Sequence, residues 1–251
     1  MAGPSPSITT NQVLAALDGE ALRRVEPSLE EVDLERRDCL FTQGEPIEYV
    51  YFPLTSVLSL VSEMSGGRVV EVATVGREGM VGVPIFLQVS TVSSHMGFCQ
   101  VPGTALRMRA ADLPELADAL PDLHRMLQRY TQALISQMAR NAGCNMVHSV
   151  EQRAARWLLT TGDRQGSDSF DLTQEFLAQM LGATRGTVNE LAQRMQAEGL
   201  ISYRRGYVQI VDTDGLQERS CECYELIARE LEHILGTPEP RARGSEPSGS
   251  V

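Results

Sequence analysis

The sequence of 251 residues predicts an α+β fold that combines a β jelly roll, a long helix and a winged helix-turn-helix, in that order. Three patterns predict it. Short runs of β-branched and aromatic residues alternate with glycine turns in the first half of the chain. A leucine repeat of helical period follows these runs. Two short amphipathic helices and a β-hairpin then complete the pattern.

The expected organisation has five segments. Tails are expected at 1–10 and 237–251, where Pro, Gly, Ser and charged residues dominate. Between the tails we expect the jelly-roll domain at 11–111, the long helix at 112–148 and the winged domain at 149–236.

The jelly roll is predicted from its strand runs. The runs 49–52, 57–61, 69–75 and 96–101 are rich in Val, Ile, Phe, Tyr and Thr, and turn signals such as Gly66-Gly67 separate them. Regularly spaced short strands of this kind are typical of sandwiches and barrels. One short helix is expected before them, over residues 11–25.

The long helix carries apolar residues at alternating spacings of three and four. This heptad spacing favours a seam against a second helix. The residues predicted at a dimer interface are Leu120, Leu123, Leu127, Tyr130 and Leu134. Two arrangements stay open: a helix with one face on its own barrel and another on a partner, or a long core helix within one chain.

The winged helix-turn-helix is predicted between residues 172 and 211. A helix capped by Thr173, a turn at Gly182 and a second helix capped by Thr184 precede a hairpin with a basic tip. The exposed start of the second helix is where such a unit reads base edges, and its free N–H groups also favour a phosphate. The candidate DNA-contacting residues are Thr173, Thr184, Arg185, Gly186, Thr187, Asn189, Glu190, Arg204 and Arg205.

The charge balance restricts how the chain could bind DNA. Its formal net charge is −11, and all 22 basic residues are arginines. Phosphate repulsion argues against non-specific coating of nucleic acid, so binding has to come from a local patch. Within 184–209 four arginines face two glutamates. A packing module with a solvated arginine face is the structural alternative.

Four stretches of the C-terminal half resemble the cyclic-AMP receptor protein/FNR (Crp/Fnr) superfamily of bacterial transcription regulators. They are EQRAARWLL at 151–159, LTQEFLAQMLG at 172–182, the Thr184-Arg185 pair and EGLI at 198–201. The resemblance implies a cyclic-nucleotide-binding-like sensory jelly roll and a homodimer joined along 119–147. It also implies double-stranded DNA with a two-fold symmetric site as partner, and RNA polymerase as a further partner.

The recognition helix departs from the family pattern at two positions. Arg185 matches the base-reading arginine of the family, but Gly186 stands where the best-known members have Glu, and Glu190 stands where Arg is frequent. The familiar half-site therefore cannot be transferred. Glu190 has two open roles: it accepts from a cytosine amino group, or it pairs with Arg194 four residues on.

The barrel departs from the family at the effector site. In the Gly-rich turn at 76–84 apolar residues stand where the family has its ribose-binding Glu, and no Arg lies between Arg77 and Arg107 to hold a cyclic phosphate. Control by cyclic AMP in the usual mode is therefore not expected, whereas a cyclic dinucleotide or another small effector stays open. The candidate pocket residues are Arg68, Gly76, Arg77, Gly79, Val81, Gly82, Ser93 and Ser94.

Other functions find little support in the sequence. No nucleophile elbow, phosphate-binding loop or zinc-protease motif is present, so no catalytic residue and no enzyme is predicted. Cys221 and Cys223 lack zinc-ribbon spacing, and we expect no metal site and no evident cofactor. The chain shows no secretory leader and no membrane span, which predicts a cytoplasmic location. The alternative function is a ligand- or partner-binding regulatory module that does not read DNA.

Overall fold

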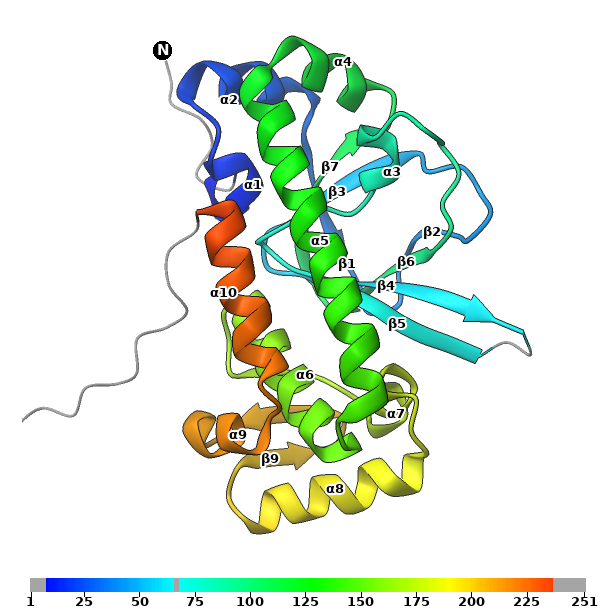
Figure 1. Ribbon diagram of the computed structural model, residues 1–251, viewed down its shortest axis with the longest axis vertical. Helices are drawn as coiled ribbons and strands as arrows, with labels where there is room; N and C mark the ends of the chain where they lie inside the picture. Colours follow the sequence, from blue (N-terminus) through cyan, green and yellow to red (C-terminus); the bar gives the residue numbers. More distant parts are fainter. Residues whose placement is uncertain (1–7, 66–67, 237–251) are drawn as a thin grey trace, which may run out of the picture.

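The computed structural model describes residues 8–65 and 68–236, without the side chain of Arg68. In Figure 1 the β barrel lies at the upper right, a long helix runs beside it through the middle of the molecule, and a small C-terminal domain lies at the lower end. The predicted tails lie outside the described residues except at Ile8–Thr10, which form the 3-10 helix η1. Ile8 is buried in the barrel core, so the ordered part of the chain includes residues that the sequence assigned to a tail.

Two antiparallel sheets form the barrel. One has the order β1-β7-β3 and the other β2-β6-β4-β5. Phe52 and Leu58, which are fully buried, belong to the core between them. The strands are β1 (Glu30–Leu34), β2 (Cys39–Phe41), β3 (Tyr49–Pro53), β4 (Val57–Met64), β5 (Arg68–Val75), β6 (Met96–Val101) and β7 (Gly103–Arg109).

The helical segments around the barrel are divided into more and shorter helices than the sequence predicts. The expected helix at 11–25 is α1 (Gln12–Ala15) followed by α2 (Gly19–Val25), because Asp18 caps a new start through the amides of Glu20 and Ala21. A 3-10 turn η2 (Glu26–Ser28) and a short helix α3 (Val83–Phe86) complete this part.

The long helical segment at 112–148 is divided by a proline. It consists of α4 (Asp112–Ala119) and α5 (Pro121–Val147). Leu120 between them is extended, because the ring of Pro121 excludes the helical conformation from the preceding residue. Proline is favourable at the first position of the helix it begins.

The residues predicted to meet a partner helix lie in the core of their own chain. All five are buried between α5 and the barrel: Leu120, Leu123, Leu127, Tyr130 and Leu134. Apolar spacing identifies the buried face of a helix but not what covers it. The outer face of α5 leaves Ile135 56% and Met146 87% exposed. Dimerisation along α5 would therefore use this outer face.

The small C-terminal domain has the winged helix-turn-helix arrangement. Its elements are α6 (Val150–Gln165), β8 (Ser169–Asp171), α7 (Gln174–Leu181), α8 (Arg185–Ala197), β9 (Ile201–Arg204), β10 (Tyr207–Ile210) and α9 (Thr213–Arg219). The three strands form one sheet in the order β8-β10-β9. Trp157, Phe176, Leu191 and Val208 belong to its core, which extends to Phe98 of the barrel.

The last helix leaves the winged domain. Helix α10 (Cys223–Leu235) returns along α5 toward the barrel (Figure 1). Leu231, Ile234 and Leu235 pack against the barrel core. The sequence predicted that the winged domain extends to residue 236, because the amphipathic pattern of this helix does not tell which surface covers its apolar side. None of the helices in the described ranges combines the length and apolarity that a membrane crossing requires.

Candidate DNA-binding interface and neighbouring sites

The helix-turn-helix is fixed by two threonine caps and a glycine turn. The Thr173 hydroxyl accepts from the Phe176 amide at 3.2 Å, and the Thr184 hydroxyl accepts from the Thr187 amide at 3.2 Å. Gly182 ends α7 with a φ of +60°, which is costly for other residues. These local signals set where α8 begins and which way it points.

Helix α8 presents its polar residues outward at the lower end of the molecule (Figure 1). Arg185, Gly186, Thr187 and Glu190 are exposed, and Asn189 is partly buried. The apolar residues Val188, Leu191 and Met195 face the domain core. The sequence-predicted contact residues of α8 therefore lie together on the accessible side of its first two turns.

The hairpin holds its arginines beside the start of α7, the first helix of the same helix-turn-helix. Arg205 and Gly206 both have positive φ, of +49° and +82°, which is the geometry of a two-residue type I′ hairpin turn. The Tyr203 hydroxyl donates to the Leu172 carbonyl at 2.6 Å, and the Leu172 amide donates to the Gly206 carbonyl at 2.7 Å. These bonds hold exposed Arg204 and Arg205 beside the start of α7.

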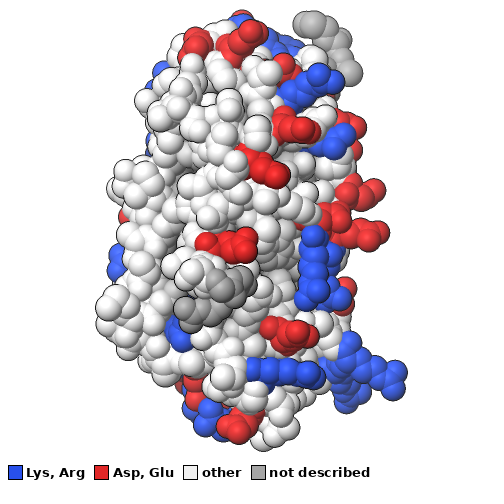
Figure 2. Space-filling model, turned by 90° about the vertical axis from the view of Figure 1, so that its right-hand side faces the viewer, with Lys and Arg blue, Asp and Glu red and all other residues white. Residues whose placement is uncertain are grey.

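The arginines of this surface are accessible to an external anion. Among the described residues, Arg185, Arg204 and Arg205 take part in no ion pair. Arg194 pairs with Glu151 at 3.3 Å rather than with Glu190, because α6 brings that carboxylate within reach. On the side of the molecule that Figure 2 shows, acidic groups are interspersed with the arginines, several of which lie near the lower end.

The turn predicted to hold an effector is filled by the protein itself. Arg164 from α6 pairs with Glu78 at 2.8 Å, and both side chains are nearly inaccessible. Arg164 also donates to the Thr74 hydroxyl and, at 3.1 Å, to the Gln137 amide oxygen. A Cβ built on Gly79 would lie 2.3 Å from the Tyr130 ring, so glycine is needed for this approach. The space between turn and helix is closed by these contacts.

The remaining predicted pocket residues do not surround one space. Gly76 lies against the Arg164 side chain, and the Arg77 guanidinium lies against Gly166 at the end of α6. Val81 pairs with β3 through its backbone, and Gly82 is the N-cap of α3. Ser93 is buried, whereas Ser94 is exposed. The side chain of Arg68 lies outside the described part.

A cavity opens elsewhere on the barrel. It has a volume of about 840 Å³, and Glu48, Tyr49, Ser90, Thr91 and Arg109 are among its lining residues. Not one of the predicted pocket residues lines it. The predicted pocket and this cavity are therefore different places on the barrel.

A partly buried acidic group joins the barrel to the winged domain. The Glu71 carboxylate accepts from the Ser59 hydroxyl at 2.9 Å and from the Trp157 indole N–H at 3.0 Å. Burial raises the pKa of Glu71 to about 7, although these donors and Arg156 oppose the shift. Sequence reasoning missed Glu71 and Arg164, because neither belongs to a local motif.

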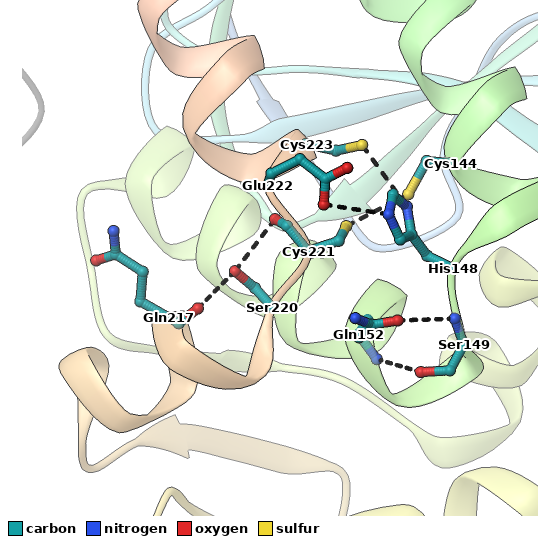
Figure 3. A network of polar contacts seen from close by, with 9 residues as sticks. All are labelled: Cys144, His148, Ser149, Gln152, Gln217, Ser220, Cys221, Glu222 and Cys223. Atoms are coloured by element: carbon teal, nitrogen blue, oxygen red, sulfur yellow. Dashed lines mark hydrogen bonds and ion pairs between the residues drawn. The ribbon is translucent and has the colours of Figure 1, made fainter.

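Four metal-binding side chains gather where α5 meets α10. Cys144, His148, Cys221 and Cys223 offer ligand atoms that all lie within 4.8 Å of one another. Figure 3 shows them pointing toward one another from the end of α5 and the start of α10. The sequence predicted no metal site here because it considered local spacing alone, and the structure brings the four side chains together from two distant segments. A Cys and a His four residues apart lie on one face of a helix, and this was the available signal.

The thiols of this cluster differ in acidity. The Cys221 thiol and the Arg156 guanidinium hold the pKa of Cys144 below its usual range. Burial raises the pKa of Cys223. All five cysteines are free thiols in the structure.

Two family models match the chain. A Crp-like helix-turn-helix domain matches residues 152–219, and a cyclic nucleotide-binding domain matches residues 31–119. Between them they account for more than half of the sequence. The matched ranges correspond to the winged domain and to most of the barrel.

Named relatives and solved structures agree with these models. The "CRP-like cAMP-activated global transcriptional regulator" of Mycobacterium tuberculosis is 27% identical over 221 residues, which cover 83% of this chain and 96% of the relative. The "Transcriptional regulatory protein btr" of Bordetella pertussis is 25% identical over 197 residues, covering 75% and 80%. The structure of FixK2 from Bradyrhizobium japonicum has a TM-score of 0.64 at 16% identity, covering 77% and 98%.

Proposed function

This chain is a DNA-binding transcription regulator of the Crp/Fnr superfamily, and we propose that it acts as a homodimer on a two-fold symmetric DNA site without cyclic AMP in the usual mode. Its place of action is then the cytoplasm, and RNA polymerase is the partner through which binding alters transcription. The assignment of individual residues below belongs to the same proposal.

Two observations carry this proposal: the start of α8 is exposed, and so is the arginine hairpin of the same domain. Arg185, Arg204 and Arg205 are accessible and take part in no ion pair among the described residues. The amides at the start of α8 add a positive dipole end beside Arg185. A local positive surface of this kind can approach DNA although the whole chain is acidic.

The proposed contacts divide into base reading and backbone positioning. Arg185 reads a guanine through two donors, Asn189 reads an adenine, and Glu190 accepts from a cytosine amino group. Gly186 leaves room beside Arg185. The groups assigned to the phosphates are the hydroxyls of Thr173, Thr184 and Thr187 and the guanidiniums of Arg204 and Arg205.

The proposed dimer uses the outer face of α5. Ile135 and Met146 are large apolar side chains that stand exposed on this helix. A second copy of α5 packed there would bury them, and it would set two α8 helices apart for successive major grooves, about 34 Å. The inner face is already covered by the barrel.

The absence of the usual cyclic-AMP mode is supported by the closed glycine turn. A cyclic phosphate would have to displace the buried Arg164–Glu78 pair and the Tyr130 ring. Separating a buried ion pair is unfavourable, because each charge then remains out of water without the partner that compensates its desolvation. A cyclic dinucleotide or another small effector would need a different place on the barrel.

Selection of bound duplexes from a random DNA library tests the proposal. The purified full chain is used without ligand, with cyclic AMP and with cyclic di-GMP, and sedimentation gives its oligomeric state. We expect a dimer and a two-fold symmetric motif without ligand. A motif that requires cyclic AMP would overturn the effector part. The absence of any motif in all three arms would favour the module that does not read DNA.

A further inference from the structure

The junction of α5, α6 and α10 contains a cluster of three thiols and one imidazole. The Cys144 Sγ lies 3.5 Å from the Cys221 Sγ, and the Cys223 Sγ lies 3.8 Å from the His148 Nδ1. All four ligand atoms are within 4.8 Å of one another. The three cysteines are buried together and separate from the two large cores.

These separations fit a single tetrahedral metal ion. Zinc bonds of about 2.3 Å to sulfur and about 2.0 Å to nitrogen place tetrahedral ligand atoms about 3.5–3.8 Å apart. The Cys144–Cys221 and Cys223–His148 separations fall within this range, and small rotamer changes would bring all pairs to the tetrahedral values. A set of three Cys and one His is a frequent donor set of structural zinc sites.

The imidazole is already oriented for metal binding. The His148 Nε2 lies 3.1 Å from the Glu222 carboxylate, which fixes the proton on that nitrogen. The other ring nitrogen, Nδ1, is left with a lone pair directed to the thiols (Figure 3). A carboxylate behind the histidine in this way is the usual outer support of a zinc-bound imidazole.

Charge and access also suit a cation held by thiolates. Three thiolates and a neutral imidazole around a divalent ion leave one negative charge. The guanidiniums of Arg153 and Arg156 lie close enough to interact with the cysteines and to balance it. A cavity of about 460 Å³, lined by Cys144, His148 and Cys223, gives a path from the surface.

We propose that Cys144, His148, Cys221 and Cys223 form a mononuclear, tetrahedral Zn²⁺ site. The last turn of α5 supplies Cys144 and its C-cap supplies His148, whereas the α9–α10 connection supplies Cys221 and the first residue of α10 is Cys223. The bound ion would fasten α10 to α5 at the point where α6 and the winged domain begin. Any effect of the ion on DNA binding rests on the function proposed above, whereas zinc binding itself does not.

Metal content and cobalt spectroscopy of the full chain test the site. The wild-type protein is purified under reducing conditions, its zinc is measured, and the zinc-free protein is titrated with Co²⁺. We expect one zinc per chain and the strong visible bands of cobalt held tetrahedrally by sulfur. Cys223→Ser should lose both signals, and Cys39→Ser is the matched control, because Cys39 is an exposed thiol outside the cluster.

A second variant keeps the test independent of folding. Glu222→Gln leaves all four ligands in place and removes only the carboxylate behind His148. It should weaken zinc binding about 10–100-fold in a competition with a chelator, whereas Glu230→Gln, at the rim of the same cavity, should not.

Three outcomes would overturn the proposal. The first is a reduced wild-type protein that retains no zinc and gives no tetrahedral cobalt spectrum. The second is a Cys144–Cys221 disulfide in protein kept under reducing conditions. The third is iron with inorganic sulfide in place of zinc, which would mean a cluster rather than a single ion. DNA selection is carried out separately, so loss of the zinc signal and loss of the DNA motif remain distinguishable.

Discussion

Two groups of arginines in the winged domain have opposite surroundings. Arg156 and Arg164 on α6 are buried, and they bond to Asn141, Glu78 and Gln137 from α5 and the barrel. Arg185, Arg204 and Arg205, by contrast, are exposed. The first group holds the winged domain to the rest of the chain, whereas the second is available to a ligand.

The difference follows from the cost of desolvating a guanidinium. A buried cation is stable only when acceptors of the same protein replace its water, so its charge is already used. An exposed cation keeps its water until a phosphate or a base edge displaces it. The two groups should therefore differ in which property their removal changes: stability for the first and DNA recognition for the second.

The largest expected effect is the loss of stability in Arg164→Ala. Removal of the guanidinium leaves the buried Glu78 carboxylate without its partner, which costs about 3–5 kcal/mol. Chemical unfolding of the variant and the wild type measures this loss. The double variant Arg164→Met/Glu78→Leu should recover most of it, because apolar groups replace both charges. If Arg164→Ala lowers the free energy of unfolding by less than about 1 kcal/mol, the buried arginines do not differ from the exposed ones in their effect on stability.

The next effect concerns DNA recognition by Arg185→Ala. We expect a loss of about 1–3 kcal/mol in discrimination at one base pair of each half-site. The unfolding free energy should change by no more than about 0.5 kcal/mol, because the side chain is exposed. Binding to the selected duplex and to its single-base variants measures the discrimination. Arg229→Ala, an exposed arginine of α10, is the control, and equal selectivity in both variants would contradict the assignment.

The buried arginines Arg156 and Arg164 both interact with Glu71, and this carboxyl should make the stability of the fold depend on pH. Its pKa is raised from 4.5 to about 7 in the folded chain. The folded state therefore retains the proton after the unfolded state has lost it, so this carboxyl stabilises the fold below pH 4.5. That contribution falls by about 3 kcal/mol as the pH rises to about 7, because each pKa unit corresponds to about 1.4 kcal/mol.

Unfolding free energies of the wild type and Glu71→Gln across this pH range measure the contribution of the carboxyl. The difference between the two proteins should grow in favour of the variant as the pH rises, because the amide has no proton to lose. A difference that does not change with pH would show that Glu71 titrates normally.

The smallest expected effect concerns the hairpin. Arg205→Gln should weaken DNA binding about equally on all sequences and reduce the slope of log affinity against log salt by about 1. Arg205→Lys keeps the charge and should keep the slope. Binding measured over a series of salt concentrations distinguishes a phosphate contact from a base contact, and an unchanged slope in the glutamine variant would place Arg205 outside the interface.

The sequence alone determined the local structure of the winged domain. Thr173 and Thr184 begin α7 and α8 as predicted, and the Arg204-Arg205-Gly206 turn joins two strands. These features depend on hydrogen bonds and backbone preferences within a few residues, so short patterns encode them. The family and the DNA-binding function followed from the same stretch of sequence.

Only the tertiary structure decided which distant groups meet. The leucine repeat correctly identified which face of α5 is buried, but the barrel rather than a second helix covers that face. Arg164 and Glu78 lie 86 positions apart, and Cys144 and Cys221 lie 77 apart. Contacts of this kind depend on how whole elements pack and on the chain closure between them, which no local period records.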